Sequence, residues 1–293
     1  MPVAVALVVG VSLGGSAGSS VGSTGASGDG QGVGGRLTVL AAASLTEVFP
    51  KIDPTPRYTF AGSNTLLQQI RQGAPADVFA SASPKEAQAA YTEGLCEKPV
   101  TFASNSLVVI TPKVNPAGVK SVYDLRRSGL KLVIAAAGVP VGDYARAALR
   151  SLGILDAALA NVVSNEPDVK SVAGKVALGE ADAGIVYRTD VLPIKDAVDV
   201  ITIPSWAQPP IRYQICVVHR SQNKTAARAF VRRVLGPIGR RVLRSALFDL
   251  PRTRGAREPT STQATRCLAG DSQPSLTHAV EPAATPVSSL MRR

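Results

Sequence analysis

The stretch "RLTVLAAASL", residues 36–45, decides how this chain folds, because an apolar run ends there in small residues and a serine. Such a run predicts a β-strand that passes directly into the first turn of a helix. Ser44 then has two interpretations. Its hydroxyl can cap the helix, or it can join the free backbone N–H groups of that turn in holding an anion.

The residues after this stretch repeat the same order of strand and helix. Residues 44–52, "SLTEVFPKI", predict a short helix ended by Pro50, and residues 57–62 predict a second strand. The next helix is expected to begin at Ser63 and to end at Gly73. A third unit, "ADVFASASPKEAQAAYTEG", follows directly. Repeated units of this length indicate an α/β protein with parallel sheets covered by helices.

Strand and helix patterns continue to residue 250, with further strands predicted in "NSLVVITP", "LKLVIAAA", "DAGIVY", "DVITIP" and "RYQICVVH". About ten strands would crowd a single sheet, so we predict two lobes, each a mostly parallel sheet flanked by helices. The first lobe is expected to contain residues 36–108 and 212–250. The second lobe is expected to contain residues 109–211.

The two ends of the chain differ from this body in composition. Residues 1–35 contain 11 of the 26 glycines, and their start, residues 2–13, is apolar. An apolar run followed by small residues is typical of a secretory signal, although no Lys or Arg precedes it here. We therefore predict export by a signal-like segment, a Gly/Ser linker up to residue 35, and a mobile tail over residues 251–293.

The net charge of the chain is +11, and much of it lies in "RAFVRRVLGPIGRRVLR", residues 228–244. A basic amphipathic helix could contact nucleic acid, but arginines on the solvated face of a core helix are the better interpretation. No aromatic interleaving, zinc pattern or helix-turn-helix spacing accompanies them. We therefore expect no nucleic-acid partner.

Cysteine and histidine are too few for most of the chemistry that they usually perform. The chain has Cys96, Cys216 and Cys267, none in a CxxC or Cys/His pattern, and two histidines, His219 and His278. These residues supply neither a zinc site nor a nucleophile with an adjacent base, so we do not expect an enzyme. Cys96 and Cys216 could pair in an exported protein, or they could be separate buried thiols.

Two serines stand where a ligand would bind in an open α/β sheet, beyond the carboxyl ends of the strands. Ser44 follows "TVLAAA" and Ser63 follows "YTFAG". Each places a hydroxyl at a strand-to-helix junction, where free N–H groups and the helix dipole favour negative charge. A simple N-cap explains either serine alone, whereas two in succession favour a binding site.

Three further positions are expected at the same edge of the sheets. Val141 in "GVPVGDY" and Val169 in "NEPDVKSV" stand in predicted first turns and offer backbone N–H groups, with Asp168 interpreted as a plain cap. Tyr187 ends the buried strand "AGIVY", so its hydroxyl is expected at the carboxyl end of that strand. A lone tyrosine there is more often half-buried packing.

These segments together resemble a known family. "LTVLAAASLTEVF", "FAGSNTLLQQIRQGAPADVFASA", "NSLVVITP", "VPVGDYARAAL" and "GEADAGIVYRTDV", in this order, are similar to the ModA family, the molybdate-binding proteins of bacterial ABC import systems. The similarity runs from about residue 36 to residue 250. It implies a two-lobed type II periplasmic-binding fold, with one oxyanion held in the cleft between the lobes.

The resemblance also implies a set of ligand residues and partners. The anion would be held without a cation, by the hydroxyls of Ser44, Ser63 and Tyr187, the amide of Ser44, and the amides of Val141 and Val169. Molybdate, and tungstate with nearly the same radius, would be captured outside the cytoplasm and delivered to a membrane ABC permease. We expect a monomer with no cofactor, and a hinge near residues 106–112 and 208–218.

The sequence departs from the family pattern at two positions. Asn64 stands where a second serine is usual, and Val141 stands where alanine is usual, so the cavity could be narrower. A receptor for another oxyanion such as sulfate, or for a small organic anion, is therefore the first alternative. An enzyme or sensory domain on the same scaffold is the second. The carboxylates expected near the cleft, Asp143 and Asp168, are better explained as helix-start residues.

Overall fold

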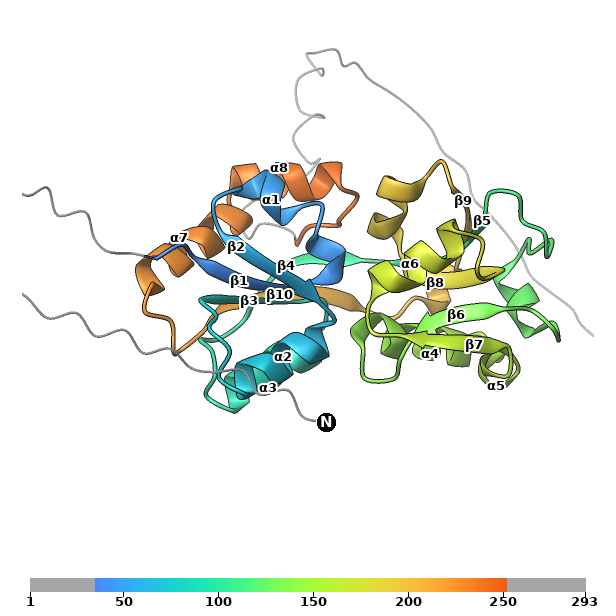
Figure 1. Ribbon diagram of the computed structural model, residues 1–293, viewed down its shortest axis with the longest axis horizontal. Helices are drawn as coiled ribbons and strands as arrows, with labels where there is room; N and C mark the ends of the chain where they lie inside the picture. The colour runs from blue at the N-terminus through green and yellow to red at the C-terminus, as the bar shows by residue number, and fades with distance from the viewer. Residues whose placement is uncertain (1–34, 252–293) are drawn as a thin grey trace, which may run out of the picture. The chain divides into compact units, whose positions relative to one another are not determined.

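The computed structural model describes residues 35–251, which form two five-stranded sheets with helices packed on them (Figure 1). This arrangement confirms the predicted fold class. The signal-like segment, most of the linker and the C-terminal tail lie outside the described residues, as do Cys267 and His278. Within the described residues, no helix combines the length and the apolar character that crossing a membrane requires.

The first sheet has the strand order β2-β1-β3-β10-β4. Strand β1 pairs in parallel with β2 and β3, whereas β10 runs antiparallel to β3 and β4. The strands are β1 (Thr38–Ala42), β2 (Arg57–Ala61), β3 (Val78–Ser81), β4 (Val100–Asn105) and β10 (Ile211–Val217).

The helices cover both faces of this sheet, because the side chains of its central strands alternate between two apolar clusters. Val39 packs in the same cluster as Phe49 and Phe230, whereas its neighbour Leu40 packs with Leu66. The helices α2 and α3 accordingly lie on one face, and α1, α7 and α8 on the other (Figure 1). They are α1 (Phe49–Ile52), α2 (Ser63–Arg71), α3 (Pro84–Thr92), α7 (Lys224–Leu235) and α8 (Pro237–Ser245).

The helix predicted over residues 44–52 is wrong in its extent. The structure has a 3₁₀ turn, η1 (Ala43–Leu45), followed by the separate short helix α1. Pro50 lies in the first turn of α1 rather than at its end. A proline fits there because first-turn N–H groups have no acceptor within the helix.

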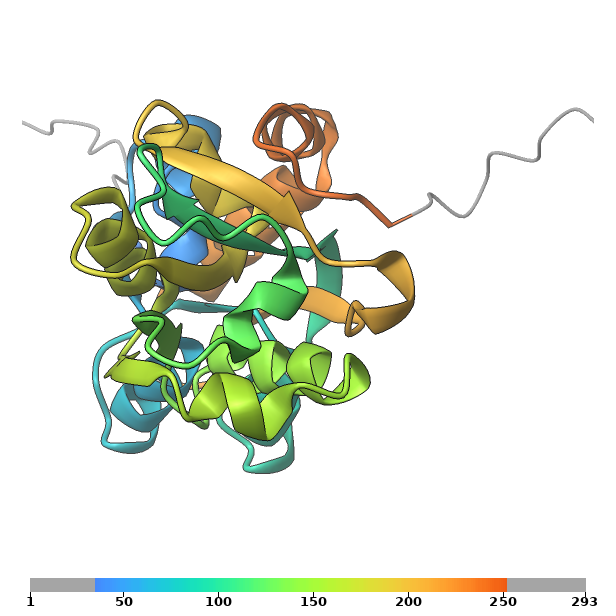
Figure 2. The same ribbon diagram turned by 90° about the vertical axis from the view of Figure 1, so that its right-hand side faces the viewer.

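The second sheet has the order β7-β6-β8-β5-β9. Strand β6 is parallel to β7 and β8, and β5 is antiparallel to β8 and β9. Helix α6 packs on one face, and α4 and α5 cover the other (Figures 1 and 2). The strands are β5 (Leu107–Pro112), β6 (Leu132–Ala135), β7 (Val162–Glu166), β8 (Ala183–Tyr187) and β9 (Val198–Thr202). The helices are η2 (Val122–Arg126), α4 (Pro140–Ser151), α5 (Leu155–Leu159), α6 (Val169–Ala177), η3 (Arg188–Ile194) and η4 (Ser205–Ala207).

The chain crosses between the two sheets twice. Only Ser106 separates β4 from β5, and residues 203–210 lead back from β9 to β10. Gln208 joins the two crossings, because its side-chain amide accepts from the N–H of Leu107 and donates to the carbonyl of Leu107, both at 2.8 Å. The residue limits of the two lobes and the position of a hinge stay predictions.

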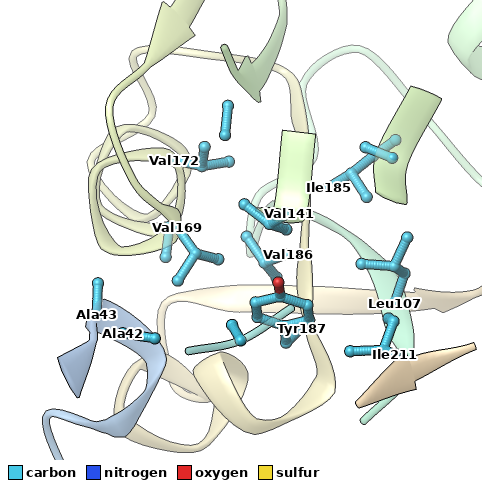
Figure 3. Close-up of a cluster of buried hydrophobic side chains, with 14 of the residues drawn as sticks. Ala42, Ala43, Leu107, Val141, Val169, Val172, Ile185, Val186, Tyr187 and Ile211 are labelled. Atoms are coloured by element: carbon cyan, nitrogen blue, oxygen red, sulfur yellow. The ribbon is translucent and has the colours of Figure 1, made fainter. Parts of the chain in front are cut away.

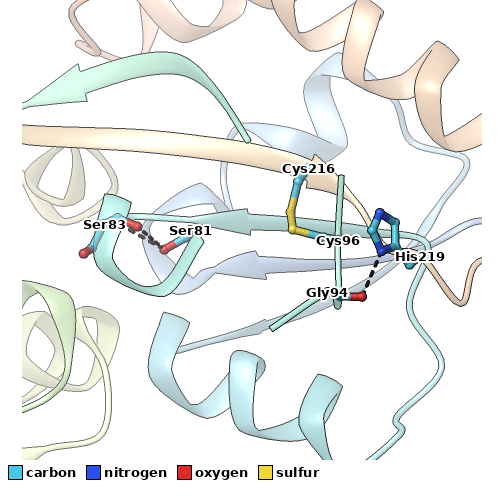
Figure 4. The surroundings of a disulfide bond; sticks show 6 residues. All are labelled: Ser81, Ser83, Gly94, Cys96, Cys216 and His219. Atoms are coloured by element: carbon cyan, nitrogen blue, oxygen red, sulfur yellow. Dashed lines mark hydrogen bonds between the residues drawn. A yellow bond between two sulfur atoms is a disulfide. The ribbon is translucent and has the colours of Figure 1, made fainter. Parts of the chain in front are cut away.

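A disulfide between Cys96 and Cys216 joins β10 to the segment after α3 (Figure 4). Both cysteines are almost fully buried, and their Cα atoms are 6.0 Å apart. His219 lies beside them, with Nδ1 2.8 Å from the carbonyl oxygen of Gly94. The pairing left open by the sequence is therefore present, and it closes a loop with a sequence separation of 120 residues.

Reducing this disulfide should lower the free energy of unfolding by about 2–5 kcal/mol, because the bond restricts a long loop in the unfolded chain. Thermal unfolding with and without a thiol reductant measures the loss. The double variant Cys96→Ser/Cys216→Ser is the matched control, and reductant should not change its transition further. An equal transition in the reduced and oxidised wild type would contradict the prediction.

Candidate functional site

One small pocket brings together all five residues that the sequence singled out. Ser44 and Ser63 come from turns that follow strands of the first sheet, and Val141, Val169 and Tyr187 come from the second. Figure 3 shows Val141, Val169 and Tyr187 beside the turn that carries Ala42 and Ala43. The remaining lining residues are Ala61, Gly62, Ala82, Val139, Pro140 and Asp168.

The pocket is small. The space in it that is open to the centre of a water molecule has a volume of about 20 Å³. A single water needs on the order of 10–15 Å³ on the same measure. In this conformation the pocket therefore suits a compact ion of a few atoms and excludes a larger organic molecule.

Three of the helices that begin around this pocket have no side-chain cap. The N-cap residues of η1, α2 and α4 are Ala42, Gly62 and Val139, and none of them makes a side-chain hydrogen bond to its helix. The first N–H groups of a helix have no acceptor within it, and they carry its partial positive charge. Their meeting at one pocket creates a site for negative charge.

Neither serine caps its helix, so that interpretation of Ser44 and Ser63 is wrong. Each lies inside the first turn, after the N-cap position. The Ser63 hydroxyl accepts a hydrogen bond from the N–H of Ala82 at 3.0 Å, and the Ser44 hydroxyl is 2.8 Å from that of Tyr213. A backbone N–H group can only donate, so Ser63 keeps its own hydrogen for another acceptor.

Tyr187 is 1% exposed, which corrects the interpretation of half-buried packing. Its hydroxyl has no hydrogen-bond partner among the described residues, although buried polar groups are nearly always paired. Burial raises the pKa of Tyr187 well above its usual range. Tyr187 is therefore a neutral donor that lines the pocket.

The second sheet also contributes helix starts. Val141 stands in the first turn of α4 after Pro140, and Val169 is the first residue of α6. Asp168 caps α6 as predicted, because its carboxylate accepts from the N–H of Ser171 at 3.0 Å. The cap serves the third residue of the helix and leaves the N–H of Val169 without an acceptor in its helix.

The lining has donors but no cation. It includes no Lys, Arg or His, and its one carboxylate, Asp168, is engaged by its own helix. Within residues 35–251, no group of three or more His, Cys, Asp or Glu side chains could hold a metal ion. Hydroxyls and helix-start amides without a counter-charge can bind a small anion.

Gly62 is a site residue that sequence reasoning did not single out. A Cβ atom at this position would lie 2.6 Å from the carbonyl oxygen of Pro167. The turn from the first sheet can therefore approach the turn from the second only because residue 62 has no side chain. The signal was the glycine directly before Ser63, but a sequence does not show what that glycine faces.

Comparison with known proteins agrees with this geometry. Residues 37–249 match the family model described as bacterial extracellular solute-binding protein. The chain belongs to this family. Membership in a family of solute-binding proteins confirms the expectation that the chain is not an enzyme. The resemblance to the ModA family is confirmed by relatives of substantial identity.

This solute-binding protein has relatives with substantial identity. It is 36% identical over 225 residues to the molybdate-binding protein ModA of Mycobacterium tuberculosis, covering 73% of this chain and 85% of that protein. It is 33% identical over 219 residues to ModA of Escherichia coli, covering 69% and 84%.

Solved structures show the same fold at lower identity. The periplasmic molybdate-binding protein of Azotobacter vinelandii has a TM-score of 0.66 at 22% identity, covering 74% of this chain and 100% of that one. The sulfate-binding protein SubI of Mycobacterium tuberculosis has a TM-score of 0.62 at 16% identity, covering 73% and 86%. At these identities the likeness concerns the fold alone.

A buried ion pair that the sequence did not reveal lies next to the pocket in this solute-binding protein. Asp190 follows Tyr187 by three residues, and its side chain is buried. Its carboxylate is 3.4 Å from the ammonium of Lys170, the residue after Val169. Burial raises the pKa of Asp190 to about 6, and Lys170 partly opposes that shift.

The Asp190 pair should make stability depend on pH. Because the folded pKa is raised above the unfolded value, Asp190 stabilises the fold below about pH 4, and this contribution is lost as pH rises through about 6. Relative to the variant Asp190→Asn, the wild type should lose on the order of 1–3 kcal/mol between pH 4 and 7.

Urea unfolding of both proteins at several pH values measures the difference. Asp196→Asn, which changes an exposed carboxylate further along the chain, is the control and should follow the wild type. A difference in stability between the wild type and Asp190→Asn that stays constant across this range would contradict the account.

Proposed function

We propose that this protein captures molybdate in the pocket between its two lobes and delivers it to a membrane ABC permease. One observation carries the proposal. Three hydroxyls, together with the helix-start amides of Ser44, Val141 and Val169, line a single small pocket that contains no cationic side chain. Relatives that are 33% and 36% identical are molybdate-binding proteins, and this supports the same ligand here.

The donor set fits a fully deprotonated tetrahedral dianion. Molybdate can only accept hydrogen bonds at neutral pH, and each bond from an N–H or O–H group to a charged oxygen contributes on the order of 1.5–3 kcal/mol. Several such bonds, together with the positive helix ends, offset the loss of hydration. A protonated anion such as hydrogenphosphate would also need an acceptor for its own hydrogen.

The two departures from the family pattern are compatible with this ligand. Asn64 does not line the pocket. The Val141 side chain is 2% exposed and packs in the apolar cluster of Figure 3, so the donor at this position is the backbone N–H. Tungstate has nearly the same radius as molybdate and should bind equally well, whereas sulfate is smaller and should fit the fixed donors poorly.

A sulfate receptor is the second candidate. The fold is shared with the sulfate-binding protein SubI, and sulfate is also a dianion that only accepts hydrogen bonds.

The proposal also covers the state and location of the protein. We propose a monomer that is exported by its N-terminal segment and works outside the cytoplasm. The membership in a bacterial extracellular family supports this location.

Isothermal titration of the full chain tests the proposed function. Molybdate and tungstate should each bind one to one, and sulfate should bind at least about a hundredfold more weakly, a difference of about 2.7 kcal/mol. Ser63→Ala should weaken molybdate binding about tenfold or more while the protein stays folded. Preferred binding of sulfate would favour the second candidate, and absence of binding to all three anions would overturn the proposal.

The close approach of Gly62 and Pro167 should be needed for tight binding. In Gly62→Ala, the new methyl group would meet the Pro167 carbonyl, so the two turns could not approach as closely around the anion. We expect molybdate affinity to fall about five- to hundredfold, the effect of an overpacked contact.

Gly174→Ala is the matched control, because a Cβ at this position in α6 meets nothing within 4 Å. It should leave the affinity unchanged and raise the free energy of unfolding by about 0.5–1 kcal/mol. Equal molybdate affinity in Gly62→Ala and the wild type would refute the role of the close approach.

A further inference from the structure

A chain of buried polar groups lies behind Ser44. The Ser44 hydroxyl is 2.8 Å from the hydroxyl of Tyr213, which in turn is 3.4 Å from Nδ2 of Asn105. The same Nδ2 donates to the hydroxyl of Thr189 at 2.9 Å. All four residues are at most 8% exposed, so these groups are shielded from bulk water.

The hydrogen bonds of Asn105 set the direction of this chain. Its side-chain oxygen accepts from the N–H of Ser106 at 2.9 Å, which turns the NH₂ group toward Thr189 and Tyr213. An NH₂ group can only donate, so the Tyr213 oxygen accepts from it. Either hydroxyl of the Ser44–Tyr213 pair could donate, but Ser44 is the partner to which the Tyr213 hydroxyl can donate among its hydrogen bonds, so the Tyr213 hydrogen is assigned to the oxygen of Ser44.

We propose that Tyr213 and Asn105 are positioning residues that hold the Ser44 oxygen as an acceptor and so aim the Ser44 hydrogen into the pocket. This inference rests on the proposed function, because the hydrogen is aimed at the bound oxyanion. Asn105 donates to Tyr213, Tyr213 donates to Ser44, and Ser44 donates to the anion.

Ser63 shows the same arrangement made in a different way. There the backbone N–H of Ala82 occupies the serine oxygen, which leaves the Ser63 hydrogen free to donate. In this arrangement the oxygen of each serine accepts a hydrogen bond from a group behind the pocket, Tyr213 for Ser44 and Ala82 for Ser63. At these two positions the pocket therefore presents hydrogen-bond donors, which favours an anion that carries no proton.

Packing fixes the Tyr213 hydroxyl in place. The ring is fully buried and makes edge-on contacts with Tyr187 and Phe248, with centroids 5.8 and 5.2 Å away. Burial raises the pKa of Tyr213 well above its usual range, so the hydroxyl keeps its hydrogen at neutral pH. Tyr213 lies on β10 and Asn105 ends β4, so both positioning residues border the crossings between the sheets.

A double-mutant cycle on molybdate affinity tests this inference. Ser44→Ala should weaken binding by about ten- to a hundredfold, and Tyr213→Phe by about three- to tenfold. The double variant should bind no more weakly than Ser44→Ala alone, because Tyr213 acts only through Ser44. A loss of packing would not depend on the residue at position 44.

Tyr58→Phe is the matched control. It removes a hydroxyl that donates to the carbonyl of Asp53 at 2.6 Å in the same sheet, away from the pocket. This variant should lower stability and leave molybdate affinity unchanged.

Binding of hydrogenphosphate provides a second readout. In Tyr213→Phe the Ser44 oxygen is free to accept the hydrogen of this anion, so the ratio of molybdate affinity to phosphate affinity should fall.

The outcomes separate this inference from the proposed function. If the wild type binds none of the oxyanions, the proposed function fails and this inference fails with it. If the wild type binds molybdate but Tyr213→Phe binds equally well, or if the two losses add in the double variant, the positioning role alone is overturned.

Discussion

Backbone N–H groups at the starts of several helices meet at one pocket, and the N-caps of three of these elements, Ala42, Gly62 and Val139, have no capping side chain. A folded chain seldom leaves such donors unsatisfied, because each carries a desolvation cost of about 1–3 kcal/mol when buried. Both sheets direct the carboxyl ends of strands to this place, so donors from distant parts of the sequence converge there. A small anion would satisfy them together, and its charge would be met by helix dipoles rather than by a cation.

The hydroxyl side chains around the pocket add further hydrogen-bond donors for the same anion. A serine that capped its own helix would use its oxygen for that helix. Ser63 instead lies one position and Ser44 two positions past the N-cap, and their oxygens face Ala82 and Tyr213. Tyr187 adds a neutral hydroxyl whose hydrogen has no other acceptor among the described residues. The lobes come close enough to share these donors because Gly62 has no side chain to meet Pro167.

The sequence predicted the parts of the structure that depend on local patterns. Apolar runs that ended in small residues placed the strands next to the pocket, and the five residues that carry the donors could be named before the structure. Strands β4 and β7 were not predicted, since both are sheet edges where polar residues such as Ser104 and Asn165 interrupt the apolar run. Contacts between distant residues, such as Ser44 with Tyr213 or Gly62 with Pro167, depend on three-dimensional proximity and leave no local pattern.

The most direct test of the account is a crystal structure of the full chain grown with molybdate, with molybdenum located by its anomalous scattering. We expect one molybdenum peak in the pocket, with anion oxygens about 2.7–3.1 Å from the hydroxyls of Ser44, Ser63 and Tyr187 and from the amide nitrogens of Ser44, Val141 and Val169. A peak in the neighbouring pocket lined by Lys51 and Lys170 would contradict it, because the anion would then be held by cations.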